Sequence, residues 1–187
     1  MRLPKIKYFK FKYFAFLIRA LRFKASYQRN ITILSVRIAF ERSCKLILDE
    51  KGEIIFGKNN YFTRLCNIEC YGAKVEFGSN NFFNKNCSIV CREGISFGDN
   101  VICGPNVNIY DHNHGMDLHQ GPFVSQEYIS AGIIIGNNVW IGANATILAG
   151  VNISDDVVVA ANSVVTTDLN SNSLYGGVPA KFIKYLE

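Results

Sequence analysis

Residues 135–146 read Ile135-Gly136-Asn137-Asn138-Val139-Trp140 and then Ile141-Gly142-Ala143-Asn144-Ala145-Thr146, and further hexads begin at Ile147, Ile153 and Val159. An aliphatic residue recurs at every sixth position, and a small or β-branched residue follows it four places later. A period of six fits neither a helix with 3.6 residues per turn nor an alternating strand. It is the sequence signature of a parallel β-helix, in which each repeat stacks on the next.

The same rhythm extends toward the N-terminus, with insertions between the repeats. Three hexads make one triangular coil of about 18 residues. The inward positions are predicted to be Phe56, Phe62, Ile68, Phe77, Phe83, Ile89, Phe97, Cys103 and Ile109. Asn stands two places after each of Gly57, Gly78, Gly98 and Gly136. We expect these Asn residues at coil corners, because Asn and Gly tolerate left-handed backbone angles.

The chain of 187 residues is expected to form one domain with small additions at its ends. We predict an all-β fold, a parallel β-helix over residues 38–175 that is interrupted by a loop over residues 110–132. Five coils are readable from Ile54 onward, and a weaker coil precedes them. Residues 1–37 are expected to form a short basic helical segment, and residues 176–187 a C-terminal tail.

The basic residues are concentrated at the N-terminus. Residues 1–40 contain ten of the twenty Lys and Arg residues and no acid, whereas the remainder has ten bases and fifteen acids. One interpretation is a helical cap over the open end of the β-helix, with Phe14, Leu17 and Leu21 buried against the first coil. The other is peripheral binding to an anionic membrane surface. Nucleic-acid binding is a weaker third reading, and we expect no such partner.

No apolar run reaches the roughly 18 residues that a transmembrane helix needs, and no secretory signal with a cleavage site is recognisable. We therefore expect a cytoplasmic protein. The six Cys residues fit this expectation, since Cys66 and Cys87 are 21 residues apart, as are Cys70 and Cys91. Matching positions on neighbouring coils indicate buried, reduced thiols rather than disulfides.

The six-residue repeat stops after Ile109 and resumes at Ile133. The intervening stretch begins Tyr110-Asp111-His112-Asn113-His114-Gly115-Met116-Asp117-Leu118-His119 and contains all three His residues of the chain. A loop this long on a regular solenoid is more often functional than accidental. Histidine is the side chain best suited to accept a proton near neutral pH. We therefore predict an active-site loop.

Sequence motifs in the loop and on both sides of it resemble those of the hexapeptide-repeat acyltransferases of the galactoside, maltose and xenobiotic acetyltransferase type, in the branch encoded with surface polysaccharide synthesis. They are Gly104-Pro105-Asn106-Val107, His112-Asn113-His114-Gly115-Met116-Asp117, Ile147-Leu148-Ala149-Gly150-Val151, Ser163-Val164-Val165-Thr166 and Gly177-Val178-Pro179-Ala180-Lys181. The resemblance covers residues 52–184. It implies left-handed coils, a homotrimer with active sites between adjacent prisms, acetyl-CoA as acyl donor and a sugar or polysaccharide precursor as acceptor.

The resemblance also assigns roles to residues. It implies that His114 is the catalytic base, with His112 as the competitor, and that Asn84, Arg92 and His112 lie on the acceptor side; His119 is expected to be structural or to contact the acceptor. Arg92 stands where the family's sugar enzymes carry an acid, and it would suit an acidic or phosphorylated sugar.

The coenzyme is implied to lie along the last coils. The matching residues are Gly104, Trp140, Gly142, Ala143, Ala161, Thr166, Lys181 and Lys184. The backbone N–H of Gly142 or Ala143 is the predicted donor to the oxyanion. No Ser or Cys is placed as an acyl carrier, so we expect direct transfer rather than a covalent intermediate.

Three alternatives remain. The first is N-acetylation of an amino sugar instead of O-acetylation. The second is a metalloenzyme related to γ-type carbonic anhydrase, for which His114 and His119 have suitable spacing but a third His on another coil is missing. We therefore expect no metal requirement. The third is a non-catalytic trimeric scaffold, which the His-rich loop disfavours.

Overall fold

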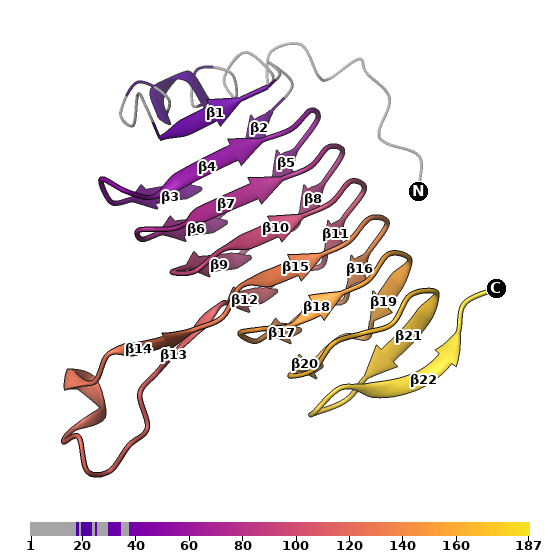
Figure 1. Ribbon diagram of the computed structural model, residues 1–187. Coiled ribbons are helices and arrows are strands. Elements are labelled where there is room, and N and C mark those ends of the chain that lie inside the picture. The colour runs from indigo at the N-terminus through magenta and orange to yellow at the C-terminus, as the bar shows by residue number, and fades with distance from the viewer. Residues whose placement is uncertain (1–17, 19, 24, 26–29, 35–37) are drawn as a thin grey trace.

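The computed structural model describes residues 18, 20–23, 25, 30–34 and 38–187. Three sheets wrap around one core as a stack of coils (Figure 1). Sheet A contains β1 (Ile31–Ile33), β4 (Glu53–Phe56), β7 (Lys74–Phe77), β10 (Ile95–Phe97), β15 (Ile133–Ile135) and β18 (Asn152–Ile153). Sheet B contains β2 (Ala39–Phe40), β5 (Tyr61–Phe62), β8 (Phe82–Phe83), β11 (Ile102–Cys103), β16 (Trp140–Ile141), β19 (Val157–Val159), β21 (Ser173–Gly176) and β22 (Lys181–Tyr185). Sheet C contains β3 (Lys45–Leu48), β6 (Asn67–Cys70), β9 (Ser88–Cys91), β12 (Asn108–Tyr110), β17 (Thr146–Ile147) and β20 (Val164–Val165).

The chain passes from sheet A to sheet B to sheet C in each coil, and neighbouring coils pair in parallel within all three sheets. This confirms the predicted parallel β-helix. The first described strand, β1, lies ahead of residue 38, where the β-helix was expected to begin, and pairs in register with β4. The solenoid therefore includes a strand whose sequence carries no recognisable hexad.

The predicted inward residues fill the interior. Phe56, Phe62 and Phe83 are fully buried, and all the other inward positions named from the sequence are buried too. Two columns of stacked rings run through the N-terminal coils: Phe40, Phe62 and Phe83 on the inner face of sheet B, and Phe56, Phe77 and Phe97 on the inner face of sheet A. The two columns meet edge to face. Offset stacking and edge-to-face contact are the arrangements that aromatic rings favour.

Asn residues lie at the corners of the coils. Asn59, Asn80, Asn100 and Asn138 all have positive φ, as predicted. A second column at the corner between sheets B and C contains Leu65, Asn86, Asn106, Asn144 and Asn162, also with positive φ. Its Asn side chains form a ladder, in which each amide donates to the next at 2.8–3.0 Å. The Asn residues of the second column thus adopt the left-handed backbone conformation of the corner and also connect neighbouring coils through their side chains.

The basic N-terminal segment falls largely outside the described residues, so Phe14, Leu17 and the proposed membrane contact are not placed. The described residues near position 20 are helical. Leu21 was expected to be buried, but it is 55% exposed. Ala20 is buried instead, and Phe23 meets the ring of Phe40 edge to face at 5.4 Å. The helical face that covers the first coil is therefore rotated from the one expected.

The segment expected as a C-terminal tail forms β22, which pairs antiparallel with β21 and extends sheet B. All six Cys residues are free thiols, and all except the half-buried Cys44 are buried, as expected. Within the described part of the chain, no helix has the length and hydrophobicity needed to cross a membrane.

Candidate active site

The His-rich loop is an ordered hairpin that projects from the stack of coils (Figure 1). It leaves sheet C after β12 and returns to sheet A at β15. Its arms are β13 (His112–His114) and β14 (Tyr128–Ser130), which pair antiparallel so that His114 lies opposite Tyr128. The pairing fixes the position of β13 relative to the solenoid.

The base of the hairpin is held by one buried carboxylate. Asp111 has no exposed surface, and its two oxygens accept the backbone N–H groups of Arg92, Glu93 and Gly94 at 2.8–3.0 Å. The same carboxylate lies 3.1 Å from Nδ1 of His112. Hydrogen bonds to an ionised group are roughly twice as strong as neutral ones. Asp111 thus fastens the loop to the turn of the preceding coil.

Tyr128 gathers three of the predicted site residues around one ring. The ring of His114 lies 4.6 Å from that of Tyr128, and the ring of His112 meets it edge to face at 5.1 Å. The guanidinium of Arg92 stands 3.8 Å above the centre of the Tyr128 ring. His112, His114 and Arg92 therefore form one cluster.

Asn84 is not placed in that cluster by any contact. It follows β8 at the corner between sheets B and C, and its Oδ1 accepts the backbone N–H of Lys85 at 2.8 Å. This is the geometry of a coil corner. An acceptor role for Asn84 stays a prediction.

The tip of the loop has its own organising residue, the buried Gln126. Its amide donates to the carbonyls of Asp117 and Gly121, and its oxygen accepts the N–H of Asp117. The backbone N–H of His119 donates to the Asp117 carboxylate at this tip, and the role of its side chain stays a prediction. The tip also exposes large apolar side chains, namely those of Met116, Leu118, Phe123 and Val124, and Ile129 is exposed on the arm β14.

Four of the predicted coenzyme residues form one stack at the corner between sheets B and C. A side chain on Gly104 would meet the backbone N of Ala143 at 2.6 Å, and one on Gly142 would meet that of Ala161 at 2.5 Å. Such distances require a residue without Cβ. The sequence expectation that Gly142 offers its N–H is wrong, because this N–H donates to the carbonyl of Val159 at 2.8 Å.

The N–H groups of Ala143 and Ala161 have no hydrogen-bond partner among the described residues. Ala143 and Ala161 occupy equivalent positions in consecutive coils, because each comes directly before an Asn of the corner ladder, Asn144 or Asn162. Two free donors in a row are what a chain of carbonyl groups, such as an acylated pantetheine, would require.

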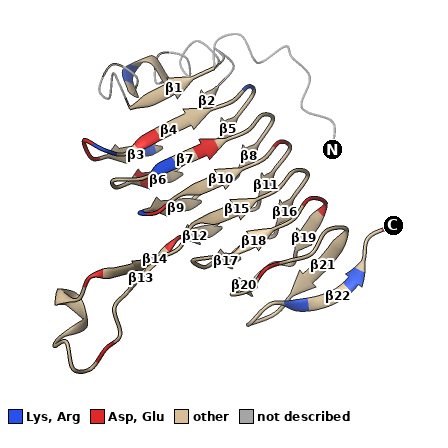
Figure 2. Cartoon of the chain, in the orientation of Figure 1, with Lys and Arg blue, Asp and Glu red and all other residues tan. Residues whose placement is uncertain are grey.

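The remaining predicted residues are spread over the last coils. Trp140 is 54% exposed on the outer face of sheet B, so it does not belong to the core. Thr166 is exposed after β20, on the edge of the prism from which the loop departs. Lys181 and Lys184 are exposed on β22, where Figure 2 shows basic residues at the C-terminal end of the stack.

The loop cluster and the Ala143 corner occupy different edges of the prism. The loop leaves between sheets C and A, whereas Ala143 lies between sheets B and C, and the width of sheet C separates them. The structure thus brings the two His residues together with Arg92, and Gly104 together with Ala143 and Ala161, but it does not join the two groups.

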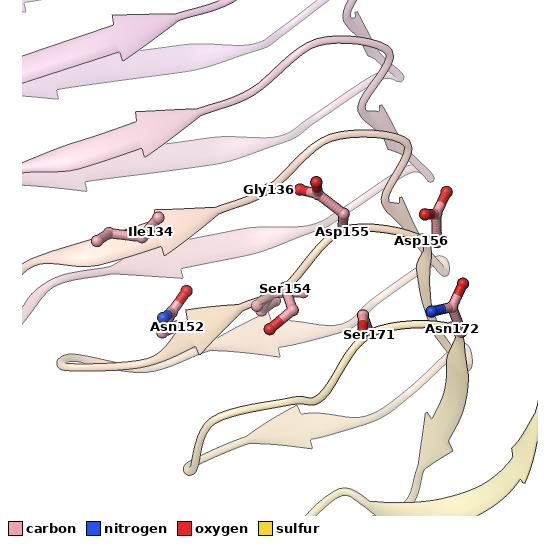
Figure 3. A pocket seen from close by; sticks show the side chains of 9 residues that line it. Ile134, Gly136, Asn152, Ser154, Asp155, Asp156, Ser171 and Asn172 are labelled. Carbon is pink, nitrogen blue, oxygen red and sulfur yellow. The ribbon is translucent and has the colours of Figure 1, made fainter.

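A shallow hollow lies elsewhere, over β18 and the following corner (Figure 3). Its polar lining includes Asn152, Ser154, Asp155, Asp156 and Ser171. The Asp155 carboxylate accepts the N–H of Asn137 at 2.6 Å, which lowers its pKa, and Asp156 accepts the amide of Asn138. Both carboxylates are links between coils, and none of the predicted site residues lines the hollow.

Two residues of the cluster were missed by sequence reasoning. Asp111 stands directly before His112, and this adjacency was a usable signal. Tyr128 lies fourteen residues after His114 and only the antiparallel pairing reveals it. Within the part of the chain that the structure describes, no group of three or more His, Cys, Asp or Glu side chains is arranged to hold a metal ion.

Comparisons with known proteins agree with this fold. A family model described as the hexapeptide repeat of succinyl-transferase matches residues 132–167. WbbJ of Escherichia coli K12, a curated protein named for O-acetyl transfer in lipopolysaccharide biosynthesis, is 34% identical over 165 residues, which span 81% of this chain and 84% of WbbJ.

Two solved structures are also similar. The maltose O-acetyltransferase of Clostridium difficile 630 has a TM-score of 0.53 and 30% identity, over 85% of this chain and 68% of that one. A variant of the N-acyltransferase AntD from Bacillus cereus, solved with dTDP and coenzyme A, has a TM-score of 0.75 at 20% identity, over 89% of each chain. At that identity AntD demonstrates the shared fold only.

The fold and the relatives define an acyltransferase built on a parallel β-helix. The chain belongs to the hexapeptide-repeat acyltransferase family, and it shares with WbbJ more than four-fifths of its length.

Proposed function

We propose that the protein transfers the acetyl group of acetyl-CoA to a hydroxyl of a sugar or polysaccharide precursor, with His114 as general base. The observation that carries the proposal is the exposed His114 on a hairpin whose base is fixed by Asp111 and whose opposite arm supplies Tyr128. A base must reach its substrate, and it must also be held in place.

The choice of His114 over His112 rests on accessibility. The His112 side chain is only 14% exposed, and its Nδ1 faces the Asp111 carboxylate. His114 is exposed at the end of β13, and no described side chain or backbone group forms a hydrogen bond with its ring. We assign His112 a positioning role, because it packs against the same Tyr128 ring as His114.

In the proposed reaction the acetyl group passes directly from acetyl-CoA to the acceptor, without a covalent enzyme intermediate. Neutral His114 removes the proton of the acceptor hydroxyl while the hydroxyl oxygen attacks the thioester carbonyl carbon. The resulting oxyanion requires a preorganised donor, and the free N–H of Ala143 is our candidate. Collapse of the intermediate breaks the carbon–sulfur bond, and protonated His114 returns the proton to the departing thiolate. The N–H of Ala161 would bind a pantetheine carbonyl.

We further propose that the site is completed between the subunits of a homotrimer. The His114 cluster and the Ala143 corner lie on different edges of one prism, so a neighbouring prism would bring them together. The apolar loop tip fits a role against a second chain, since contiguous exposed apolar surface marks interaction sites. A second apolar surface, which we call the sheet B ladder, runs along the outer face of sheet B and consists of Tyr61, Phe82, Ile102, Trp140 and Val158.

O-acetylation is preferred to N-acetylation, because WbbJ and the maltose enzyme are both named as O-acetyltransferases. The deciding experiment incubates the purified protein with acetyl-CoA and a panel of sugars and amino sugars. Release of free coenzyme thiol and the mass of the product are followed together. Acetylated sugar with an alkali-labile ester supports the proposal. Products acetylated on the amino nitrogen alone would establish the N-acetyl alternative, and thiol release without any acetylated sugar would refute both.

A further inference from the structure

Arg92 has no acidic partner within ion-pair distance among the described residues. Its guanidinium lies 3.8 Å from the centre of the Tyr128 ring and 4.9 Å from that of Tyr71. No ion pair or side-chain hydrogen bond joins this guanidinium to any other described residue, and its Nε is buried without an acceptor. The two aromatic rings therefore supply its immediate contacts, through cation–π attraction.

The acidic groups nearby are already engaged. Glu69 accepts hydrogen bonds from Asn67 and from the hydroxyl of Tyr71. Glu93 accepts one from Ser130. Asp111 is occupied by three backbone N–H groups and His112. Within the described part of the chain, none of these carboxylates forms an ion pair with Arg92.

The terminal nitrogens of Arg92 remain available. Unlike Nε, they are not among the buried atoms that lack a partner. A guanidinium presents these N–H groups in a planar fork that matches carboxylate and phosphate oxygens in pairs. Stacking on Tyr128 restricts the orientation of this plane and so reduces the entropy lost when an anion binds.

We propose that the acceptor carries an anionic group, a carboxylate or a phosphate, and that Arg92 binds this group while a hydroxyl of the same molecule reaches His114. This inference rests on the proposed function and names the acceptor class. Arg92 and His114 both contact the Tyr128 ring, and the proposal places one acceptor molecule across the two. Arg92 is thus a specificity-determining residue.

The test compares matched acceptors that differ in one charged group: glucose with glucuronic acid, galactose with galacturonic acid, and glucose with glucose 6-phosphate. The wild-type protein should show a kcat/KM at least about 10-fold higher for a charged member than for its neutral partner. The carboxylate and phosphate arms identify which anion is preferred.

Three variants test what the Arg92 guanidinium contributes to acceptor binding. Arg92→Gln should lower kcat/KM about 10- to 100-fold for charged acceptors, mainly through KM, and should lower it less for their neutral partners. Arg92→Lys keeps the charge but loses the planar fork, and should recover only part of the loss. Arg64→Gln, at an exposed Arg paired with Glu41, is the matched control and should behave as wild type. The clamp on Asp111 uses the backbone N–H of residue 92, so it survives these substitutions.

Calorimetric titration of glucuronate and of glucose 6-phosphate supplies a readout independent of turnover. Binding of either anion to the wild type, weakened at least about 10-fold in Arg92→Gln, supports the inference even without catalysis. Equal activity on neutral and charged acceptors, or an equal loss on both in Arg92→Gln, overturns it and leaves the proposed function intact. Failure to acetylate any sugar refutes the proposed function, and anion binding that is unchanged by Arg92→Gln refutes this inference separately.

Discussion

The carboxylate of Asp111 lies 3.1 Å from Nδ1 of His112, and it closes the base of the His-rich hairpin at the same time. Its oxygens accept three consecutive backbone N–H groups from the preceding coil. The loop is therefore connected to the solenoid by these buried hydrogen bonds as well as by the chain itself. This connection gives a projecting arm the fixed position that a general base requires.

Asp111→Asn should destabilise the protein and reduce turnover together. The amide keeps one acceptor oxygen but turns an NH₂ group toward N–H donors, and unsatisfied buried groups cost about 1–3 kcal/mol each. We expect the free energy of unfolding to fall by about 2 kcal/mol and kcat to fall at least about 10-fold. Urea unfolding and steady-state kinetics measure the two effects.

Asp117→Asn is the matched control, because Asp117 accepts hydrogen bonds at the exposed tip of the same loop. It should cost less than about 1 kcal/mol. Equal losses in the two variants would show that the buried clamp has no special role.

Leu65→Asn should stabilise the protein. Leu65 has a φ of 65° and is 56% exposed, in a column whose next members are Asn86 and Asn106. A branched side chain in the left-handed region costs about 1–2 kcal/mol, and the new side-chain amide would also extend the ladder by one coil. We expect a gain of about 1 kcal/mol in the free energy of unfolding, measured by urea denaturation. Asn86→Leu should lose at least as much; a destabilised Leu65→Asn variant would contradict the account of the corners.

The sheet B ladder predicts how the chain assembles. Light scattering of the intact protein should give a mass near three chains at micromolar concentration. Trp140→Lys should dissociate the trimer and abolish activity, because a charge in a buried apolar interface is costly. Ile134→Lys is the control, since Ile134 on sheet A is as exposed as Trp140. A fully active monomer would rule out a site shared between subunits.

The buried thiols predict a loss of stability at alkaline pH. Burial raises the pKa of Cys103 well above its ordinary value of 9.0, so the unfolded chain releases this proton first. The stabilisation is present below pH 9 and is lost as pH rises through the unfolded pKa toward the higher folded pKa. The urea midpoint should fall between about pH 8 and pH 10.5, and it should fall less steeply in Cys103→Ala. Identical pH slopes for the two proteins would argue against this thiol as the cause.

Sequence reasoning reached the solenoid but only part of the site. The inward residues and the Asn corners were predictable because the hexad repeats them. The same residue types recur at the same positions in each coil, so the pattern can be recognised several times in one sequence. The cluster on Tyr128 was not predictable, since it depends on a single hairpin that has no counterpart in other coils. Leu21 was misplaced for a similar reason: a short helix of mixed apolar residues does not define which face will meet the first coil.

The role of His114 as the proton acceptor is the central claim. The direct test measures kcat and KM for acetyl-CoA in wild type, His114→Ala and His112→Ala, with the best acceptor from the sugar panel. We predict that His114→Ala lowers kcat at least about 10²-fold with little change in the KM for acetyl-CoA, and that His112→Ala has a smaller effect. A mild His114→Ala variant beside an inactive His112→Ala variant would contradict the assignment and transfer the catalytic role to the Asp111–His112 pair.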